Sequence, residues 1–207
     1  MLLVLIIIII KKYLGENMKT LKITKPTMEK RVSRFDELKP LPIQIDKDIP
    51  QAGKDIVYAR ELLSVIGLDP SEGKTPINSG APIVGAGGIT MTLAKCPVGQ
   101  GPGLHNHLAT FETFTVLEGE FLIKWNDDGS EELVLKKHDT ISIPPGVCRS
   151  FTNIGKEEGL LQVIISGGVH DMNDISFTPF AASQMEKIEP NLSKKFKDVG
   201  FKFNAGI

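Results

Sequence analysis

Residues 99–119 read GQGPGLHNHLATFETFTVLEG and place two histidines and a carboxylate within a short, glycine-flanked span. His105 and His107 are two residues apart, so both imidazoles point to one face if the segment is an extended strand. Two imidazoles and a carboxylate such as Glu112 suit a divalent transition metal. The sequence therefore predicts a metal site formed by His105, His107 and Glu112.

The position of Glu112 places a condition on this site. Glu112 follows His107 by five residues, and in an unbroken strand an odd offset puts two side chains on opposite faces. The carboxylate can join the imidazoles only if the chain bends, turns or bulges between Leu108 and Phe111. We expect such an interruption at this point.

The spacing of these residues resembles the first sequence motif of the cupin superfamily. That motif runs Gly, five residues, His, one residue, His, four residues, Glu, six residues, Gly. Every fixed position is matched, with Gly99 opening the motif and Gly119 closing it. Membership would imply an all-β fold, a jelly-roll double-stranded β-helix with a site in the mouth of the barrel.

A second stretch, HDTISIPPGVCRSFTN at residues 138–153, resembles the second cupin motif with two departures. Pro144, Gly146 and Asn153 match that motif. His138 replaces its opening glycine, and Arg149 replaces its metal-binding histidine. A guanidinium has no lone pair for a metal, so a site of three histidines and one glutamate requires a substitute ligand.

Three interpretations of Arg149 follow from this departure. In the first, His105, His107 and Glu112 alone hold a metal, and Arg149 points into the mouth to orient the anionic group of a substrate. In the second, Arg149 pairs with Glu112 in a metal-free cavity. In the third, Arg149 faces solvent and another residue is the fourth ligand, the remaining histidines being His138 and His170.

Three further residues are candidates for lining the cavity and binding the substrate. Phe114 and Phe151 lie close to the two motifs, although aromatic residues of a barrel more often form its core. Gln162 lies among apolar residues of an expected strand, where a buried amide needs hydrogen-bond partners; an outer-face position is the alternative.

These residues lead to two functional hypotheses. The first is a metal-binding cupin that acts on a small anionic organic molecule, using Fe, Mn, Ni or Zn. Its leading reaction class is dioxygenase-type oxidoreduction, because two histidines and one carboxylate resemble the ligands of non-haem iron oxygenases. The second is a metal-free cupin that binds or senses a small molecule over an Arg149–Glu112 pair.

The charge balance and the number of cysteines indicate which binding partners and which cellular compartment to expect for this protein. Lys plus Arg number 24 and Asp plus Glu number 25, so charge gives no case for nucleic acid or an anionic membrane as partner. The two cysteines, Cys96 and Cys148, cannot form a disulfide framework and fit a reducing compartment such as the cytoplasm. Analogy with other cupins adds the expectation of a homodimer.

Outside the motifs, the chain divides into four expected parts. Residues 1–17 are an apolar extension, 18–87 an arm with a helix, 88–170 the barrel, and 171–207 a C-terminal extension. Within the arm, the pattern predicts a short strand at 43–45 and a helix at 55–66 with apolar residues at helical spacing. Short strands are expected at 89–95, 111–117, 120–126, 132–135, 140–143, 149–153 and 160–166, and short helices at 181–188 and 191–198.

The apolar run at residues 2–10 fits no targeting pattern well. It is shorter than the roughly 20 residues of a membrane-spanning helix, and Lys11 and Lys12 follow the run, whereas in a secretory signal the positive charge precedes it. A weak membrane anchor is one interpretation. We favour the other, in which Met18 is the true start and residues 1–17 are a gene-model extension.

Overall fold

The computed structural model describes residues 20–71, 73, 80–167 and 172–207. The run at 1–17 and His170 lie outside these residues. The chain forms two compact units, residues 1–30 and 31–207. In the first, the only described helix is α2 (Lys25–Glu29), which buries none of its residues. No helix in the described ranges is both long and apolar enough to cross a membrane.

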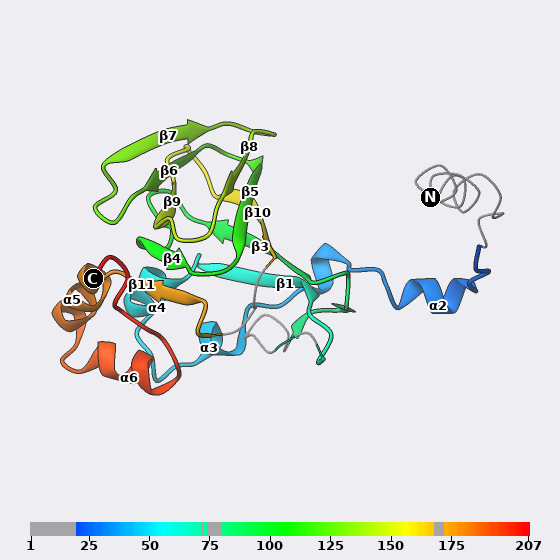
Figure 1. Ribbon diagram of the computed structural model, residues 1–207, viewed down its shortest axis with the longest axis horizontal. Helices are drawn as coiled ribbons and strands as arrows, with labels where there is room; N and C mark the ends of the chain where they lie inside the picture. Colours follow the sequence, from blue (N-terminus) through cyan, green and yellow to red (C-terminus); the bar gives the residue numbers. More distant parts are fainter. Residues whose placement is uncertain (1–19, 72, 74–79, 168–171) are drawn as a thin grey trace, which may run out of the picture. The chain divides into compact units, whose positions relative to one another are not determined.

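The second unit is built from two facing β-sheets (Figure 1). Among the described residues, the first sheet has six strands in the order β2-β1-β3-β10-β5-β8 and the second has five in the order β11-β4-β9-β6-β7. The strands of the first sheet are β1 (Glu61–Gly67), β2 (Ile83–Val84), β3 (Ile89–Cys96), β5 (Phe111–Glu118), β8 (Thr140–Ile143) and β10 (Gly159–Ser166). Those of the second are β4 (His105–His107), β6 (Phe121–Trp125), β7 (Glu131–Leu135), β9 (Arg149–Asn153) and β11 (Ile175–Phe177). The expected jelly-roll barrel is confirmed.

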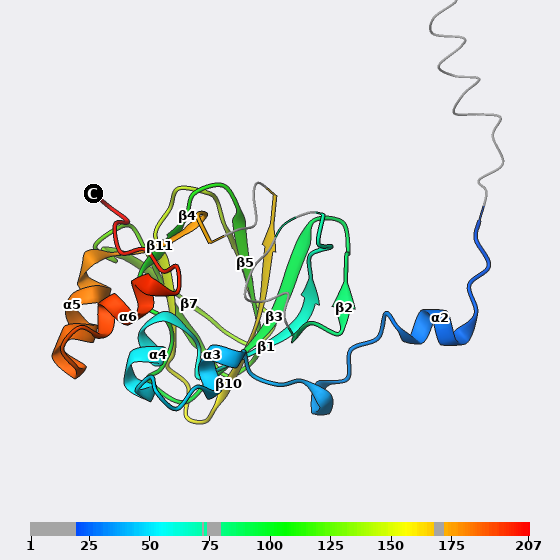
Figure 2. The same cartoon turned by 90° about the horizontal axis from the view of Figure 1, so that it is seen from below.

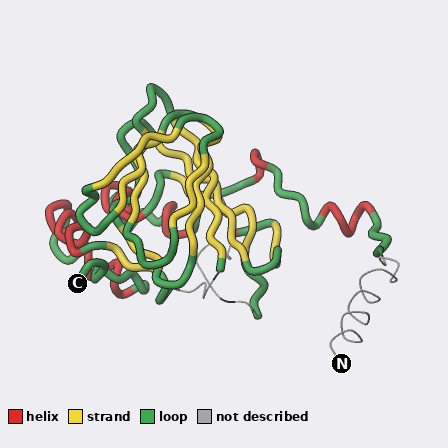
Figure 3. Tube along the Cα trace, turned by 45° about the horizontal axis from the view of Figure 1, so that its top comes forward, coloured by secondary structure: helices red, strands yellow, loops and turns green. Residues whose placement is uncertain are grey.

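Helices lie outside the body of strands (Figure 3). They are η1 (Phe35–Glu37), α3 (Pro42–Ile45), α4 (Gln51–Val57), α5 (Pro179–Ile188) and α6 (Leu192–Asp198). Helices α4, α5 and α6 gather on one side of the strands (Figure 2), around Met185, Leu192 and Phe196, which are fully buried. The expected helices at 181–188 and 191–198 are thus present with small changes in their bounds.

The segment expected to be a helix at 55–66 is instead the end of α4 followed by strand β1. Its apolar residues fit a helical period and also a buried strand, and β1 pairs antiparallel with β3 over most of its length. Between the two elements, the side chain of Gln100 receives a hydrogen bond from the Arg60 N–H at 2.8 Å and donates one to the Tyr58 carbonyl at 2.8 Å. These bonds hold the chain extended where a helix would have to continue.

The short strand expected at 43–45 is also wrong, because these residues belong to helix α3. Pro42 occupies the first turn, where its fixed φ favours a helix and its missing N–H costs no hydrogen bond. The buried Gln44 amide accepts hydrogen bonds from the Leu41 and Leu62 N–H groups and donates to the Ala59 carbonyl. This side chain therefore ties α3 to the start of β1.

The end of the chain closes one edge of the second sheet. The Phe177 N–H of β11 donates to the Lys202 carbonyl at 2.9 Å, and the Ala205 N–H donates to the Phe177 carbonyl at 3.0 Å. Phe201 and Phe203 pack into the cluster formed by the helices. The tail thus continues the backbone pairing beyond β11, the strand that lies beside His105 and His107.

Asn153, the asparagine of the second motif, has a structural role. Its buried side chain donates to the Cys96 and Glu157 carbonyls and accepts from the Gly155 N–H, each at 2.8 Å. It thereby joins the end of β9 to the end of β3 and to the turn before β10. Close by, Gly101 crosses the backbone of β9, where an added Cβ would lie 1.8 Å from the Phe151 carbonyl oxygen.

We predict that Gly101→Ala lowers the free energy of unfolding by about 3 kcal/mol, because the added methyl group forces two backbones apart. Urea denaturation of both proteins measures the difference. Gly80→Ala is the matched control, since a Cβ at that position meets nothing within 4 Å. Equal stability of the two variants would contradict the close crossing.

Candidate metal centre and cavity

His105 and His107 project from β4 in one sheet, and Glu112 projects from β5 in the other. Residues 108–110 lie between the two strands outside any regular element and carry the chain from one sheet to the next. This is the interruption that the odd offset of Glu112 requires. One ligand-type atom from each of the three side chains lies within 4.8 Å of the others.

The distances within this group fit a shared cation. His105 Nε2 lies 3.4 Å and His107 Nε2 3.6 Å from Glu112 Oε2. Two ligands about 2.1 Å from one ion in a tetrahedral arrangement lie about 3.4 Å apart. Glu112 Oε2 is buried and has no hydrogen-bond partner, so its lone pairs remain available to a metal.

The other ring nitrogen of each histidine has a hydrogen-bond partner. His105 Nδ1 lies 2.9 Å from the Gly103 carbonyl oxygen, which can only accept. His107 Nδ1 lies 2.9 Å from Thr110 Oγ1, whose own proton goes to Asp174 Oδ2. Both rings therefore carry their proton on Nδ1 and leave a lone pair on Nε2, the tautomer that a metal needs.

The ionisation of the site agrees with this assignment. Burial lowers the pKa of His107, so its imidazole is neutral at neutral pH. Burial also acts to raise the pKa of Glu112, but the imidazoles of His107 and His105 in their protonated form, together with the charge of Arg149, outweigh this effect and leave it at about 2. Glu112 is therefore an ionised carboxylate at neutral pH.

Arg149 is fully buried on β9, opposite His105 in the sheet. Its Nε lies 3.6 Å from Glu112 Oε2, and its Nη2 donates to the Pro144 carbonyl at 3.2 Å. The solvent-facing position of the third interpretation is therefore wrong. The pairing with Glu112 is that of the second interpretation, and it coexists with the ligand geometry of the first.

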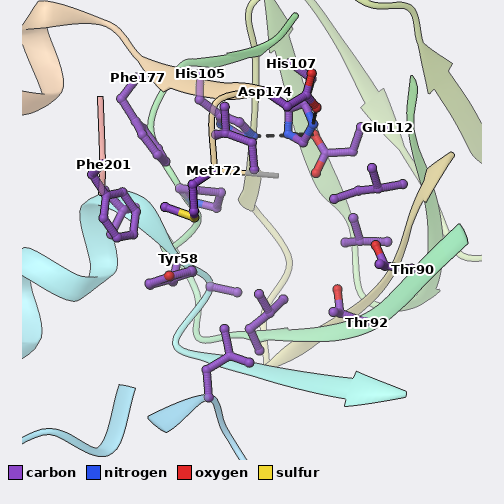
Figure 4. A pocket seen from close by; sticks show the side chains of 18 of the residues that line it. Tyr58, Thr90, Thr92, His105, His107, Glu112, Met172, Asp174, Phe177 and Phe201 are labelled. Carbon is purple, nitrogen blue, oxygen red and sulfur yellow. Dashed lines mark ion pairs between the residues drawn. The ribbon is translucent and has the colours of Figure 1, made fainter. Parts of the chain in front are cut away.

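A cavity of about 120 Å³ adjoins the three residues (Figure 4). Most of its wall is apolar and comes from both sheets, α4, the arm and the tail. These lining residues are Leu41, Val57, Ala59, Leu62, Pro102, Phe151, Val163, Ile165, Met172, Ile175, Phe177 and Phe201. The polar part of the wall is formed by Tyr58, Thr90, Thr92, His105, His107, Glu112 and Asp174.

Comparison with known proteins matches residues 92–165 to the family model of the cupin domain. This range contains both motifs and all four residues of the buried cluster, His105, His107, Glu112 and Arg149. These residues form a cupin domain.

Individual relatives of the chain match it only in part. An uncharacterized protein of Methanocaldococcus jannaschii is 37% identical over 70 residues, which cover 33% of this chain and 54% of the relative. The chain thus spans about half the length of this curated relative.

Solved structures give similarly partial matches. A protein of Bacillus halodurans named BH2720 is 22% identical with a TM-score of 0.39, covering 42% of this chain and 69% of that one. A predicted oxalate decarboxylase of Thermotoga maritima is 25% identical with a TM-score of 0.36, covering 38% and 66%.

The remaining sequence candidates occupy different places in the cupin domain. Phe151 lines the cavity, as expected. Phe114 is fully buried in the core, with its ring 5.1 Å from that of Phe151. Gln162 lies on the other face of β10 from Val163, and its Nε2 approaches Met91 Sδ at 3.7 Å. Neither Phe114 nor Gln162 is a lining residue, and Arg149 reaches the cavity wall only through Glu112.

Sequence reasoning missed Asp174 and Thr110. Asp174 accepts hydrogen bonds from the Ala109 N–H and the Thr110 hydroxyl, both at 2.5 Å, and thereby fixes the segment between β4 and β5. Thr110 and Asp174 are 64 residues apart, so no local pattern connects them. Tyr58 was missed as well; burial raises its pKa, so it presents a neutral hydroxyl.

We predict that Arg149→Met lowers the free energy of unfolding of the metal-free protein by about 3–5 kcal/mol, because it leaves Glu112 buried without its cation. Urea denaturation in the presence of a chelator measures this loss. The control is Arg60→Met, which removes the ion pair of Arg60 Nη2 with Asp55 Oδ2 at 2.7 Å. Because this pair is partly exposed, we expect its loss to lower the free energy of unfolding by about 1 kcal/mol or less. Equal losses in the two variants would show that the Arg149–Glu112 contact is not a buried ion pair.

Proposed function

We propose that His105, His107 and Glu112 bind a divalent transition metal and that the protein acts on a small organic molecule held in the adjoining cavity. The main support is that the Nε2 atoms of His105 and His107 both face Glu112 Oε2, which has no hydrogen-bond partner. Without a cation, this arrangement leaves three electron-rich atoms facing one another at a buried position. Cupin-domain membership supports the same ligand set.

A metal held by two histidines and one carboxylate keeps open coordination positions and supplies Lewis acidity and, for iron, reactivity towards oxygen. The reaction class that we propose is therefore oxygen-dependent, of the dioxygenase type. Around these positions the chain supplies a wall of aliphatic and aromatic side chains, which excludes water from the reacting group. Phe177, with its ring 5.1 Å from that of His105, forms the part of this wall next to the imidazole.

The charges around the site favour an anionic donor on the bound molecule. Glu112 and Asp174 are each negative, Arg149 is positive, and all three are buried. A divalent ion added to this set leaves one uncompensated positive charge. A carboxylate or enolate oxygen on the substrate would neutralise it. Arg149 thus favours an anionic substrate by offsetting the charge of Glu112, without touching the substrate itself.

A second candidate function is metal-free binding or sensing of a small molecule. The specific observation in its favour is the contact of 3.6 Å between Arg149 Nε and Glu112 Oε2, which gives the carboxylate a cation without a metal. In that case no metal charge would favour an anionic molecule in the cavity, because Arg149 already offsets Glu112 and Asp174 stays negative. The expected homodimer stays a prediction under both functions.

We expect purified protein reconstituted with Fe²⁺, Mn²⁺, Ni²⁺ or Zn²⁺ to retain about one equivalent of metal, and His105→Ala and His107→Ala each to abolish retention. Elemental analysis after desalting measures the metal. His138→Ala is the control, since this residue lies in an exposed turn away from the cluster. Wild-type protein that retains no metal would favour the metal-free function.

For the oxygen-dependent reaction, the measurement is oxygen consumption by the iron-loaded protein with a panel of small carboxylates. Consumption that requires both the iron and one of the acids supports the dioxygenase class. Conversion of an acid that proceeds equally without oxygen would replace it with a lyase, isomerase or decarboxylase reaction at the same site.

We predict that Asp174→Asn weakens Zn²⁺ binding by about 10–100-fold, because Asp174 holds Thr110 in the orientation that fixes the His107 ring. Isothermal titration with Zn²⁺ gives both affinities. Asp139→Asn serves as the control, since the Asp139 side chain is exposed and accepts a hydrogen bond from the Lys136 N–H in a turn away from the cluster. An unchanged affinity in Asp174→Asn would exclude this positioning role.

A further inference from the structure

Two threonines on β3, Thr90 and Thr92, line the cavity beside the proposed metal centre. Their exposed fractions are 1% and 2%, and they are two residues apart, so both project from the same face of the sheet. Figure 4 shows them below Glu112 with their oxygens directed into the cavity. Neither hydroxyl has a hydrogen-bond partner among the described residues.

A third hydroxyl lies beside them. Ser64 on β1 is paired with Thr92, and directly opposed residues share a face of a sheet. Its exposed fraction is 1%, and its Oγ also has no hydrogen-bond partner. We call Ser64, Thr90 and Thr92 the hydroxyl strip.

Within the hydroxyl strip, Ser64 Oγ is fully buried without a partner, and the Thr90 and Thr92 hydroxyls face the cavity. A buried hydroxyl without a partner costs about 1–3 kcal/mol. The cross-strand neighbours of Thr90 and Thr92 on β10 are Ile165 and Val163, which offer no hydrogen bond through their side chains. Thr90 and Thr92 line the cavity, so a molecule bound there can supply the hydrogen-bond partners of their hydroxyls, whereas Ser64 is not a lining residue.

The strand register places the strip at a defined distance from the metal ligands. Glu112 is paired with Ile165, and Ile165 is paired with Thr90, so Glu112 and Thr90 lie two strands apart in one row. Two strand spacings amount to about 10 Å. Ile165 lies between them, and Val163 follows it on the same face.

The charged residues that line the cavity all lie beside the proposed metal centre, at the end of the cavity away from Thr90 and Thr92. Within the described part of the chain they are Glu112 and Asp174, together with the titratable His105 and His107. A charged group at the hydroxyl strip would therefore be buried without a counter-charge, at a cost that hydroxyls alone do not offset. The group that fits the strip is uncharged.

We propose that the molecule bound in the cavity has two polar ends, an anionic oxygen donor at the metal and an uncharged hydroxyl or carbonyl group at Thr90 and Thr92. An apolar body joins them across Ile165 and Val163. The anionic end rests on the proposed metal function, whereas the uncharged end rests on the hydroxyl strip alone. The substrate class is thus a short-chain organic acid with a distal uncharged oxygen.

The test uses the full chain loaded with Zn²⁺ and two series of probes. One series comprises unbranched carboxylates of roughly four to eight carbons, chosen to span the two-strand distance; the other comprises the same acids with a terminal hydroxyl. Isothermal titration measures each affinity. At a matching chain length, we expect the terminal hydroxyl to tighten binding about 5–10-fold, the effect of one or two hydrogen bonds.

Thr90→Val and Thr92→Val, singly and together, keep the shape of the side chain and remove the hydroxyl. We expect the double variant to bind the hydroxy acid no more tightly than the parent acid. Thr115→Val is the matched control, because Thr115 lies on the outer face of β5, where its hydroxyl pairs with Thr140 at 3.0 Å. That variant should keep the full gain from the terminal hydroxyl.

Thermal unfolding without ligand provides an independent measurement. Because the Thr90 and Thr92 hydroxyls lack partners, replacing them with methyl groups should leave the unfolding temperature unchanged or raise it. A clear decrease would show that these hydroxyls have protein partners, and would overturn the inference. Two titration results would also overturn the inference. One is that the terminal hydroxyl does not tighten binding to the zinc-loaded protein at any chain length, and the other is that it still tightens binding to the double variant. Failure to bind zinc would instead overturn the proposed function and with it the anionic end of the molecule.

Discussion

The burial of the Glu112 carboxylate between two imidazoles and a guanidinium is the constraint around which this fold is organised. A buried carboxylate is stable only if opposite charge or hydrogen bonds offset its lost hydration. Arg149 supplies a permanent charge from the facing sheet, at 3.6 Å. A hydrogen-bond partner at Nδ1 of each histidine turns its Nε2 towards the same carboxylate.

Much of this cluster could be predicted from sequence, because its ligands fall within eight consecutive residues, the two histidines follow the period of a strand, and the odd offset of Glu112 requires the interruption at 108–110. The sequence could not predict that the Arg149 side chain points inward to Glu112, because Glu112 lies on the other sheet. Nor could it predict Asp174, because Asp174 meets Thr110 only after the chain has folded back over 64 residues.

The same distinction between local pattern and distant partners explains which strands could be predicted from the sequence and which could not. Strands at 111–118 and 159–166 alternate between buried and partly exposed residues and were predicted closely. The segment 61–67 is mostly apolar, its period is ambiguous, and it becomes a strand because β3 offers an edge to pair with. Where a partner far along the chain decides the conformation, local pattern is a weak guide.

The pairing of the tail with β11 bears on how the protein is made. The ribosome releases both histidines long before it releases Asp174, Phe177 and Phe201, which complete the pocket wall. A nascent chain that has emerged only as far as β10 therefore contains His105, His107 and Glu112, but its cavity is still open to solvent. The cavity wall is therefore complete only after the tail has been synthesised and has paired with β11.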